Sequence, residues 1–218
     1  MVNLSLPQEF FLLNLKSNGK FPAATSHEFG ALLASVLIEF NQQELIVFSE
    51  KKFEIKPTPF PAELEYLSPV YQILEELKKK TATALANKYF TFSDKNYKVL
   101  TTNIINTLTV KGIIQREKSR GILGERIIYH PSNKEKDRII QRIRAELLEE
   151  GLVSPQTAAL VFMMNRLKKL DQYFSKYESG TLKDRVKELK KTQENQIVKD
   201  ILDHLDMIYA AMIIAAAT

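Results

Sequence analysis

The chain contains no cysteine and no tryptophan, and seven of its 218 residues are glycine. Without cysteine, disulfide cross-links and thiolate metal sites are excluded. The glycines form neither G-x-x-x-x-G-K-[ST] nor G-x-G-x-x-G, so the sequence lacks these phosphate-binding loops. The longest apolar run, from Met207 to Ala217, has 11 residues, whereas a helix that crosses a bilayer needs about 20. We therefore expect no membrane-spanning helix.

Catalytic chemistry has few candidates in this sequence. The three histidines, His27, His130 and His204, are far apart, and none belongs to an H-x-x-x-H pair. His204 lies between Asp203 and Asp206, but adjacent positions on a helix point in different directions. We therefore expect no catalytic residue, no metal ligand and no cofactor, and an enzyme is the least supported class. The first residues lack a basic leader and a long apolar segment, so we also expect no secretory signal.

Serine residues mark the starts of several predicted helices. Ser5, Ser26 and Ser154 each precede apolar residues at helical spacing, and Ser132 with Glu135 matches the S-x-x-E capping box. The predicted helices cover residues 6–15, 27–40, 67–80, 83–90, 94–112, 133–150, 155–170 and 182–191, and the end of the chain from residue 197.

Two segments alternate in the manner of strands. Residues 44–59, ELIVFSEKKFEIKPTP, predict a small hairpin that ends at Pro57 and Pro59. The segments GIIQREK, from residue 112, and ERIIYH, from residue 125, predict a second hairpin. We therefore expect a mainly α, single-domain globule over residues 1–218, with two or more small β-hairpins.

Three further expectations concern the helices. Val110 is expected on the buried stripe of the helix over 94–112. The lysine-rich end of the helix over 67–80 suits the negative pole of the helix dipole. Gly180 is expected to break the chain, with Thr181 capping the helix that follows.

The tip of the second hairpin is unusually apolar. Hairpin tips normally carry polar residues, but this one offers Ile122 and Leu123, with Arg120 and Arg126 on its flanks. Residues 111–144 hold ten basic and four acidic groups, a net charge of +6, while the rest of the chain sums to −1. Local positive charge indicates a polyanionic partner. The alternative is a solvated basic face with no partner.

Apolar tip residues among cations are typical of contact with a membrane surface. Ile122 and Leu123 would enter the acyl boundary, while Arg116, Arg120 and Arg126 would contact anionic headgroups. Burial of the two aliphatic side chains would contribute roughly 3–5 kcal/mol, which is enough for reversible docking. Two alternatives remain open: the tip packs against another protein chain, as in self-association, or it folds back onto its own domain.

A different class of function fits the same segment. The order helix, helix, hairpin over residues 82–130 is that of a winged helix-turn-helix, a nucleic-acid-binding unit. The helix over 94–110 would then enter a major groove. Its exposed face would present Lys95, Asn96, Lys98, Thr102, Asn103 and Asn106. The apolar wing tip, and the positive charge that follows the hairpin, weigh against this interpretation.

Several segments in order carry a family resemblance: QEFFLLNLKSNGKF, GALLASVLIEF, ELIVFSEKKFEIKPTP, VKGIIQREKSRGILGERIIYHP, SPQTAALVFMMNRL and IYAAMIIAAAT. Together they resemble the Golgi phosphoprotein 3 family, nearly end to end. The resemblance implies a single, mostly α-helical domain that binds membranes peripherally. In eukaryotic members it implies a pocket for phosphatidylinositol 4-phosphate, a hairpin that assists membrane insertion and self-association, and a role in retaining glycosyltransferases.

The resemblance also implies positions for the headgroup pocket. The family's tryptophan and arginine positions fall at Ala24 and Leu33, and two further basic positions fall at Lys98 and Thr101, so only Lys98 keeps its charge. The arginine-rich leader of eukaryotic members is absent. We therefore predict a bacterial-type member, cytoplasmic and peripheral on the inner face of a membrane. It would bind anionic phospholipid through Lys98 and the hairpin arginines, with membrane proteins as its adaptor clients.

Overall fold

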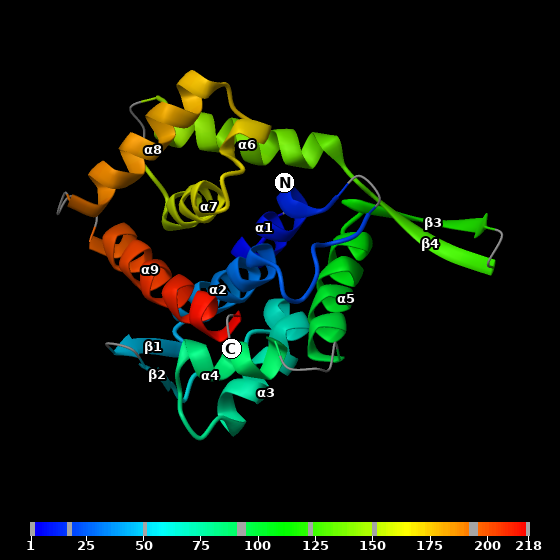
Figure 1. Ribbon diagram of the computed structural model, residues 1–218, viewed down its shortest axis with the longest axis horizontal. Helices are drawn as coiled ribbons and strands as arrows, with labels where there is room; N and C mark the ends of the chain where they lie inside the picture. The colour runs from blue at the N-terminus through cyan, green and yellow to red at the C-terminus, as the bar shows by residue number, and fades with distance from the viewer. Residues whose placement is uncertain are drawn as a thin grey trace.

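A computed structural model describes residues 3–16, 19–49, 52–90, 95–121, 124–149, 152–191 and 196–216. Within these ranges nine α-helices surround one hydrophobic core, and two antiparallel strand pairs lie at its periphery (Figure 1). The predicted mainly α, single-domain fold with two small hairpins is confirmed. None of the helices in these ranges combines the length and the apolar character needed to span a bilayer.

Most elements are helices, and strands occur only in the two hairpins of the described chain. The helices are α1 (Leu6–Asn14), α2 (His27–Gln42), α3 (Ser68–Glu76), α4 (Ala82–Phe90), α5 (Lys95–Val110), α6 (Asn133–Leu147), α7 (Pro155–Arg166), α8 (Lys176–Lys191) and α9 (Gln196–Ala216), with 3-10 turns η1 (Ala62–Leu67) and η2 (Leu170–Gln172). The strands are β1 (Ile46–Ser49), β2 (Lys52–Ile55), β3 (Ile114–Gly121) and β4 (Gly124–Pro131).

Helix α2 forms the centre of the core. Every residue from Phe29 to Phe40 is buried, and α1 and α9 pack against this helix. Ser26 caps α2 as predicted, because its hydroxyl accepts a hydrogen bond from the Phe29 amide at 3.2 Å. A helix that is apolar around its whole circumference must lie inside a domain, and α2 does so.

Helix α1 is also buried throughout, and its polar side chains all have partners. The Gln8 amide donates to the Thr107 hydroxyl at 2.9 Å. The Asn14 amide donates to the Phe10 carbonyl at 2.8 Å, and its oxygen accepts from Lys169 at 2.9 Å. Buried polar groups are tolerated when they are hydrogen-bonded, so α1 stays in the core without an unsatisfied amide.

The predicted boundaries of the helices are partly correct. The hydroxyl of Ser132 accepts from the Glu135 amide at 3.3 Å, which confirms the start of α6. Helix α3 ends at Glu76, earlier than predicted, and the lysines that follow it are not helical. Lys80 folds back and donates to the carbonyls of Leu74 at 2.7 Å and Glu75 at 2.6 Å, so it satisfies the last turn of α3 from outside the helix.

Two expectations about helix interiors are wrong. Val110 is 90% exposed, because it lies two positions after the buried Leu108 and therefore on the other side of α5. Gly180 does not break the chain, since α8 continues through it. The Thr181 hydroxyl donates to the Tyr177 carbonyl one turn earlier, at 3.2 Å, instead of capping a helix. A single glycine costs a helix only about 1 kcal/mol, which packing readily offsets.

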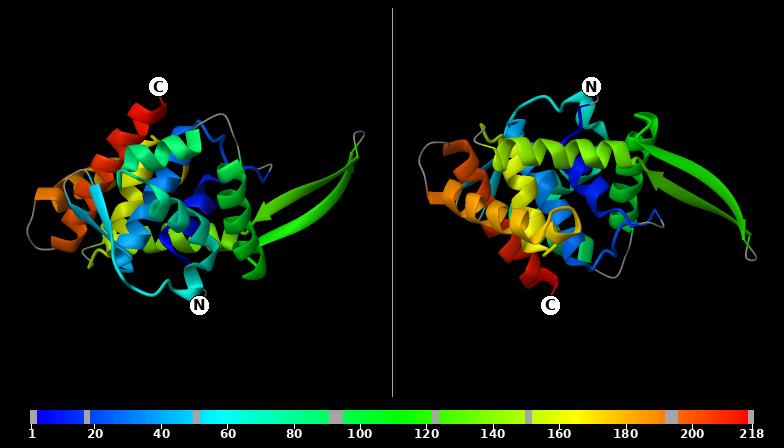
Figure 2. Two further views of the ribbon diagram at one scale, coloured as in Figure 1. Left: turned by 90° about the horizontal axis from the view of Figure 1, so that it is seen from below. Right: turned by 90° about the horizontal axis from the view of Figure 1, so that it is seen from above.

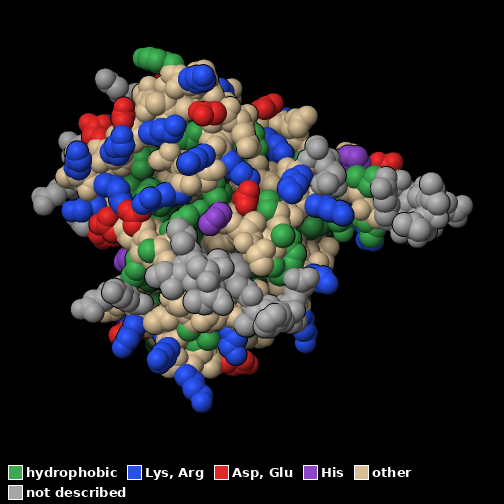
Figure 3. All heavy atoms as spheres, in the orientation of Figure 1, with side chains coloured by type: hydrophobic (Ala, Val, Ile, Leu, Met, Phe, Trp, Pro, Cys, Tyr) green, Lys and Arg blue, Asp and Glu red, His purple; other side chains and the backbone are tan. Residues whose placement is uncertain are grey.

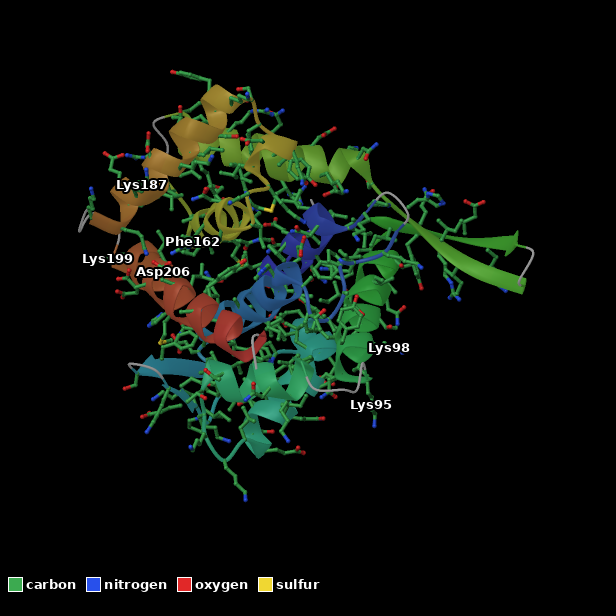
Figure 4. The ribbon with its side chains drawn as sticks, in the orientation of Figure 1. Lys95, Lys98, Phe162, Lys187, Lys199 and Asp206 are labelled. Atoms are coloured by element: carbon green, nitrogen blue, oxygen red, sulfur yellow. The ribbon has the colours of Figure 1, made fainter. Side chains whose placement is uncertain are left out.

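Helices α7, α8 and α9 meet at one charged junction. The Arg166 guanidinium and the Lys190 ammonium each lie 5.2 Å from the centre of the Phe162 ring. Asp206 of α9 forms ion pairs with both cations, and Figure 4 shows it facing Phe162. One carboxylate thus joins three helices, and it is committed to this junction.

Candidate functional site

The β3–β4 hairpin projects from the helical body, as three views show (Figures 1 and 2). The strands pair from Ile114 with Pro131 as far as Gly121 with Gly124. At about 3.3 Å per residue, eight-residue strands reach roughly 26 Å. The described strands therefore lead away from the helical body, while the alternative in which the tip folds back concerns Ile122 and Leu123, which lie outside the described residues.

The base of the hairpin is fixed to the core. Ile113 and Ile114 are buried, and the turn before them uses Gly112 at φ +70°. On the other strand, Tyr129 is approached by Gly19 from the loop between α1 and α2. A Cβ at position 19 would lie 2.3 Å from the Tyr129 carbonyl oxygen, and Gly19 also has φ +71°. Only glycine fits both conditions, so the close packing of this segment against β4 depends on glycine at position 19.

The two faces of the ribbon differ in chemistry. Cross-strand partners share a face, and the register pairs Arg116 with Tyr129 and Lys118 with Ile127. Both cations are exposed, Ile127 is 42% exposed, and Tyr129 is half-buried. This first face therefore combines positive charge with apolar area. We call it the cationic face.

The second face of the ribbon carries a local ion pair. His130 Nε2 lies 2.8 Å from Glu117 Oε2, and both side chains are largely exposed. Ile128, which pairs with Glu117, is half-buried on this face. The acid on this face has a partner of its own, so it does not neutralise Arg116 or Lys118.

The predicted tip lies at the limit of what the structure describes. Ile122 and Leu123 lie outside the described residues. Of Arg120 and Arg126 the backbone alone is described: Arg120 pairs with Glu125 and Arg126 with Ser119. Position 126 therefore belongs to the second face, whereas Arg116 belongs to the cationic face.

Lys98 does not join the hairpin arginines. It is exposed near the beginning of α5, while the hairpin leaves the far end of that helix (Figure 4). Val110 lies twelve positions after Lys98 along the helix, a rise of about 18 Å. The predicted headgroup residues therefore form two groups and not one site.

The other positions that the family resemblance assigned to a headgroup pocket are not available for binding. Ala24 is buried and Leu33 is fully buried in the core. Thr101 is buried too, and its hydroxyl donates to the Tyr97 carbonyl at 2.8 Å. Lys98 is the one exposed cation among the four positions, so they do not build a stereospecific phosphate pocket.

Several cations of the 111–144 window are paired within the protein. Arg142 binds Glu9, Arg144 binds Glu178 at 2.8 Å, and Arg138 binds Glu135 at 2.8 Å. The pairing with Arg144 lowers the pKa of Glu178 to about 2. Two of the acids, Glu9 and Glu178, come from other parts of the chain. The charge count therefore overstated the positive charge available near the hairpin.

Helix α5 offers fewer polar side chains than the winged-helix alternative requires. The Asn96 amide donates to the Lys88 carbonyl at 3.0 Å, and the Asn103 amide donates to the Tyr66 carbonyl at 3.2 Å. The other four candidates, Lys95, Lys98, Thr102 and Asn106, are exposed on this helix. Two of the six proposed base-reading residues thus serve the fold.

His204 does not join the aspartates of α9. It packs against Phe48 in a tilted arrangement, with ring centres 4.4 Å apart. Asp206 instead faces Arg166 and Lys190, and Asp203 lies 3.6 Å from Lys190. Within the described ranges, no group of three or more His, Cys, Asp or Glu side chains is arranged to hold a metal ion.

These features define a mainly α protein with one core and a cationic, partly apolar hairpin that stands away from it. The chain belongs to the Golgi phosphoprotein 3 (GPP34) family, whose model matches residues 6–205. No curated protein matches the chain.

Sequence reasoning missed three members of the cationic face: Lys118, Ile127 and Tyr129. A usable signal was present. If two residues connect the strands, counting outward from Gly121 and Gly124 pairs Lys118 with Ile127 and Arg116 with Tyr129.

Proposed function

We propose that this protein docks reversibly on anionic phospholipid membranes through the β3–β4 hairpin. The observation that carries the proposal is the cationic face, where Arg116 and Lys118 lie across the ribbon from Tyr129 and Ile127. Membership of the Golgi phosphoprotein 3 family supports it. The apolar residues Ile122 and Leu123 between the strands supply the inserting group, which the flanking cations hold at the headgroup level.

The proposed recognition is by charge and insertion, not by the shape of one headgroup. Ala24, Leu33 and Thr101 occupy the positions of a headgroup pocket, and none of them can bind a phosphate there. Each cation close to an anionic surface contributes about 1 kcal/mol, which falls with salt. Binding through charge and insertion does not require a phosphoinositide. The proposal places the protein, as a bacterial-type member of the family, on the inner face of a membrane.

Vesicle flotation tests the proposal. The vesicles contain phosphatidylcholine alone or with phosphatidylglycerol, at low and at physiological salt. We expect the wild type to float only with the anionic vesicles. The Ile122→Asp, Leu123→Asp double variant should bind roughly a hundredfold or more weakly, because two buried aliphatic side chains are lost. Arg116→Glu with Lys118→Glu should weaken binding about tenfold or more at low salt and less at high salt.

The chain offers a matched control. Val110 and Leu152 are 90% and 97% exposed, so Val110→Asp with Leu152→Asp places the same charges elsewhere on the surface. This control should float as the wild type does. If the Ile122→Asp, Leu123→Asp variant also floats as the wild type does, the membrane proposal is wrong. A mobility shift with duplex DNA that persists in that variant would favour the winged-helix alternative.

Self-association and an adaptor role are further parts of the proposal. Ile127 is 42% exposed on the hairpin, so it is open to a second copy as well as to lipid. Analytical ultracentrifugation without lipid should show a concentration-dependent oligomer, which Ile122→Asp with Leu123→Asp reduces to monomer. A wild type that stays monomeric throughout would remove self-association and leave the lipid proposal standing.

A further inference from the structure

A second basic surface lies on the other side of the helical body from β3–β4, beside the β1–β2 hairpin (Figures 1 and 2). The surface is hollowed to about 940 Å³, between β2 and the turn that joins α3 to α4. Among the described residues that line the hollow, four are lysines, namely Lys52, Lys78, Lys79 and Lys80, and one, Glu54, is a carboxylate. Figure 3 shows Lys and Arg side chains gathered along this lower edge of the molecule.

The two walls of the hollow are held together. The Phe53 amide on β2 donates to the Lys80 carbonyl at 2.9 Å, which fastens the turn to the strand. The Lys80 ammonium is used by the carbonyls of Leu74 and Glu75 at the end of α3. The turn before α4 is therefore attached to β2 by a main-chain hydrogen bond and to α3 by the Lys80 side chain.

Three cations remain for a partner. Lys52, Lys78 and Lys79 are exposed, and the described part of the chain gives none of them an ion pair or a side-chain hydrogen bond. The carboxylate of Glu54 instead lies 3.9 Å from Lys56. This arrangement differs from the 111–144 window, where internal acids pair with the arginines. The hollow thus has an unbalanced positive charge.

The lining favours one class of partner. A bilayer surface is flat, and membrane contact uses exposed apolar side chains, but Phe53 in this lining is 2% exposed. Single-stranded nucleic acid stacks its bases on exposed aromatic rings, and the described lining has none. An extended acidic peptide needs neither, because its carboxylates follow one another about 7 Å apart on each side and match the positive charge of the two walls.

We propose that Lys52, Lys78 and Lys79 form a docking site for an extended acidic segment of a partner protein. The site goes beyond the proposed lipid binding and does not depend on it. Because the two hairpins lie on opposite sides of the body, a peptide in the hollow leaves β3–β4 free. The protein could then hold a partner and a membrane at the same time.

Fluorescence anisotropy with a labelled octaglutamate peptide tests the site, with an octaglutamine peptide as the neutral probe. We expect the full-length protein to bind the acidic peptide only. The Lys52→Glu, Lys78→Glu, Lys79→Glu variant should bind it about tenfold or more weakly at low salt. A control with the same change in net charge, Lys176→Glu, Lys187→Glu, Lys191→Glu on α8, should stay within about twofold of the wild type. Circular dichroism confirms that both variants fold.

Each result separates this site from the lipid surface. The lysine variant should still float with anionic vesicles, and the Ile122→Asp, Leu123→Asp variant should still bind octaglutamate. Equal peptide binding by the wild type and the lysine variant, or no binding by the wild type, overturns the proposal. Tighter binding of a single-stranded oligonucleotide or of vesicles, lost in the same lysine variant, overturns it in favour of that other partner.

Discussion

Arg142 of α6 forms a bidentate ion pair with Glu9 of α1. Nη1 lies 2.8 Å from Oε1 and Nη2 lies 2.6 Å from Oε2, and the Glu9 side chain is 1% exposed. The two residues are 133 positions apart in the chain. This pair therefore connects α1, which is buried throughout, to the helix that follows the hairpin, and it removes one arginine from the surface charge.

Arg142→Met should be strongly destabilising, because it leaves the Glu9 carboxylate buried without a cation. Breaking a buried pair from one side costs about 3–5 kcal/mol. For a chain of this length, that corresponds to a fall in Tm of roughly 6–20 °C. Urea unfolding and calorimetry measure both quantities.

Two companion variants make the interpretation specific. Glu9→Gln with Arg142→Met removes both charges and should recover much of the lost stability. Arg185→Met breaks an exposed i,i+3 pair with Glu188 and should cost less than about 1 kcal/mol. A single Arg142→Met variant as stable as Arg185→Met would contradict the role assigned to this pair.

Three glycine-to-alanine changes should have different outcomes. Gly19→Ala should destabilise most, because its Cβ would overlap the Tyr129 main chain and its φ is positive. Gly112→Ala meets open space and should cost only the backbone strain, about 1 kcal/mol. Gly180→Ala lies inside α8 with nothing within 4 Å, so it should stabilise by roughly 0.5–1 kcal/mol.

Urea unfolding of the three variants gives the order directly, and hydrogen exchange of the β4 amides shows where Gly19→Ala acts. We expect faster exchange at Tyr129 in that variant and unchanged exchange there in Gly180→Ala. If Gly19→Ala lowered the free energy of unfolding no more than Gly112→Ala does, a side chain at position 19 would not clash with the Tyr129 main chain.

Glu39→Gln should change how stability depends on pH. Burial raises the pKa of Glu39 above 4.5, although the Leu6 amide donates to it at 2.9 Å. A raised pKa in the folded state means that folding favours the protonated acid. Its contribution to stability is therefore full below pH 4.5 and is lost as pH rises through the folded-state pKa. The glutamine keeps the acceptor for Leu6 and cannot ionise.

The free energy of unfolding, measured in urea from pH 4.5 to neutrality, tests this sign. The difference between Glu39→Gln and the wild type should move in favour of the variant as pH rises. A difference that is constant over this range, or that moves the other way, would contradict the raised pKa.

Local sequence patterns predicted where helices begin better than where they end. They also predicted helix starts better than the positive charge that remains unpaired near the hairpin. The hydroxyls of Ser26, Ser132 and Ser154 each accept a hydrogen bond from the amide three residues later. A short stretch of sequence therefore contains both partners of each cap. The end of α3 depends on Lys80, whose ammonium returns from outside the helix. The continuity of α8 through Gly180 depends on packing, which no local rule contains.

The candidate site was predictable to the extent that it is local. Alternation along the chain identified the hairpin, and its register follows from the turn length. Arg144 and its partner Glu178 are 34 positions apart in the sequence, so composition alone could not predict this ion pair. The lysine hollow was missed because its walls, near Lys52 and Lys79, meet only in the folded chain.

Gly19 lies so close to the Tyr129 main chain that a Cβ there would overlap it, and Tyr129 is near the base of the projecting β3–β4 hairpin. The segment that contains Gly19 connects α1 to α2, so a displacement of β4 at Tyr129 would press directly on this connection. A load on the ribbon and the stability of the central helices should therefore be mechanically coupled.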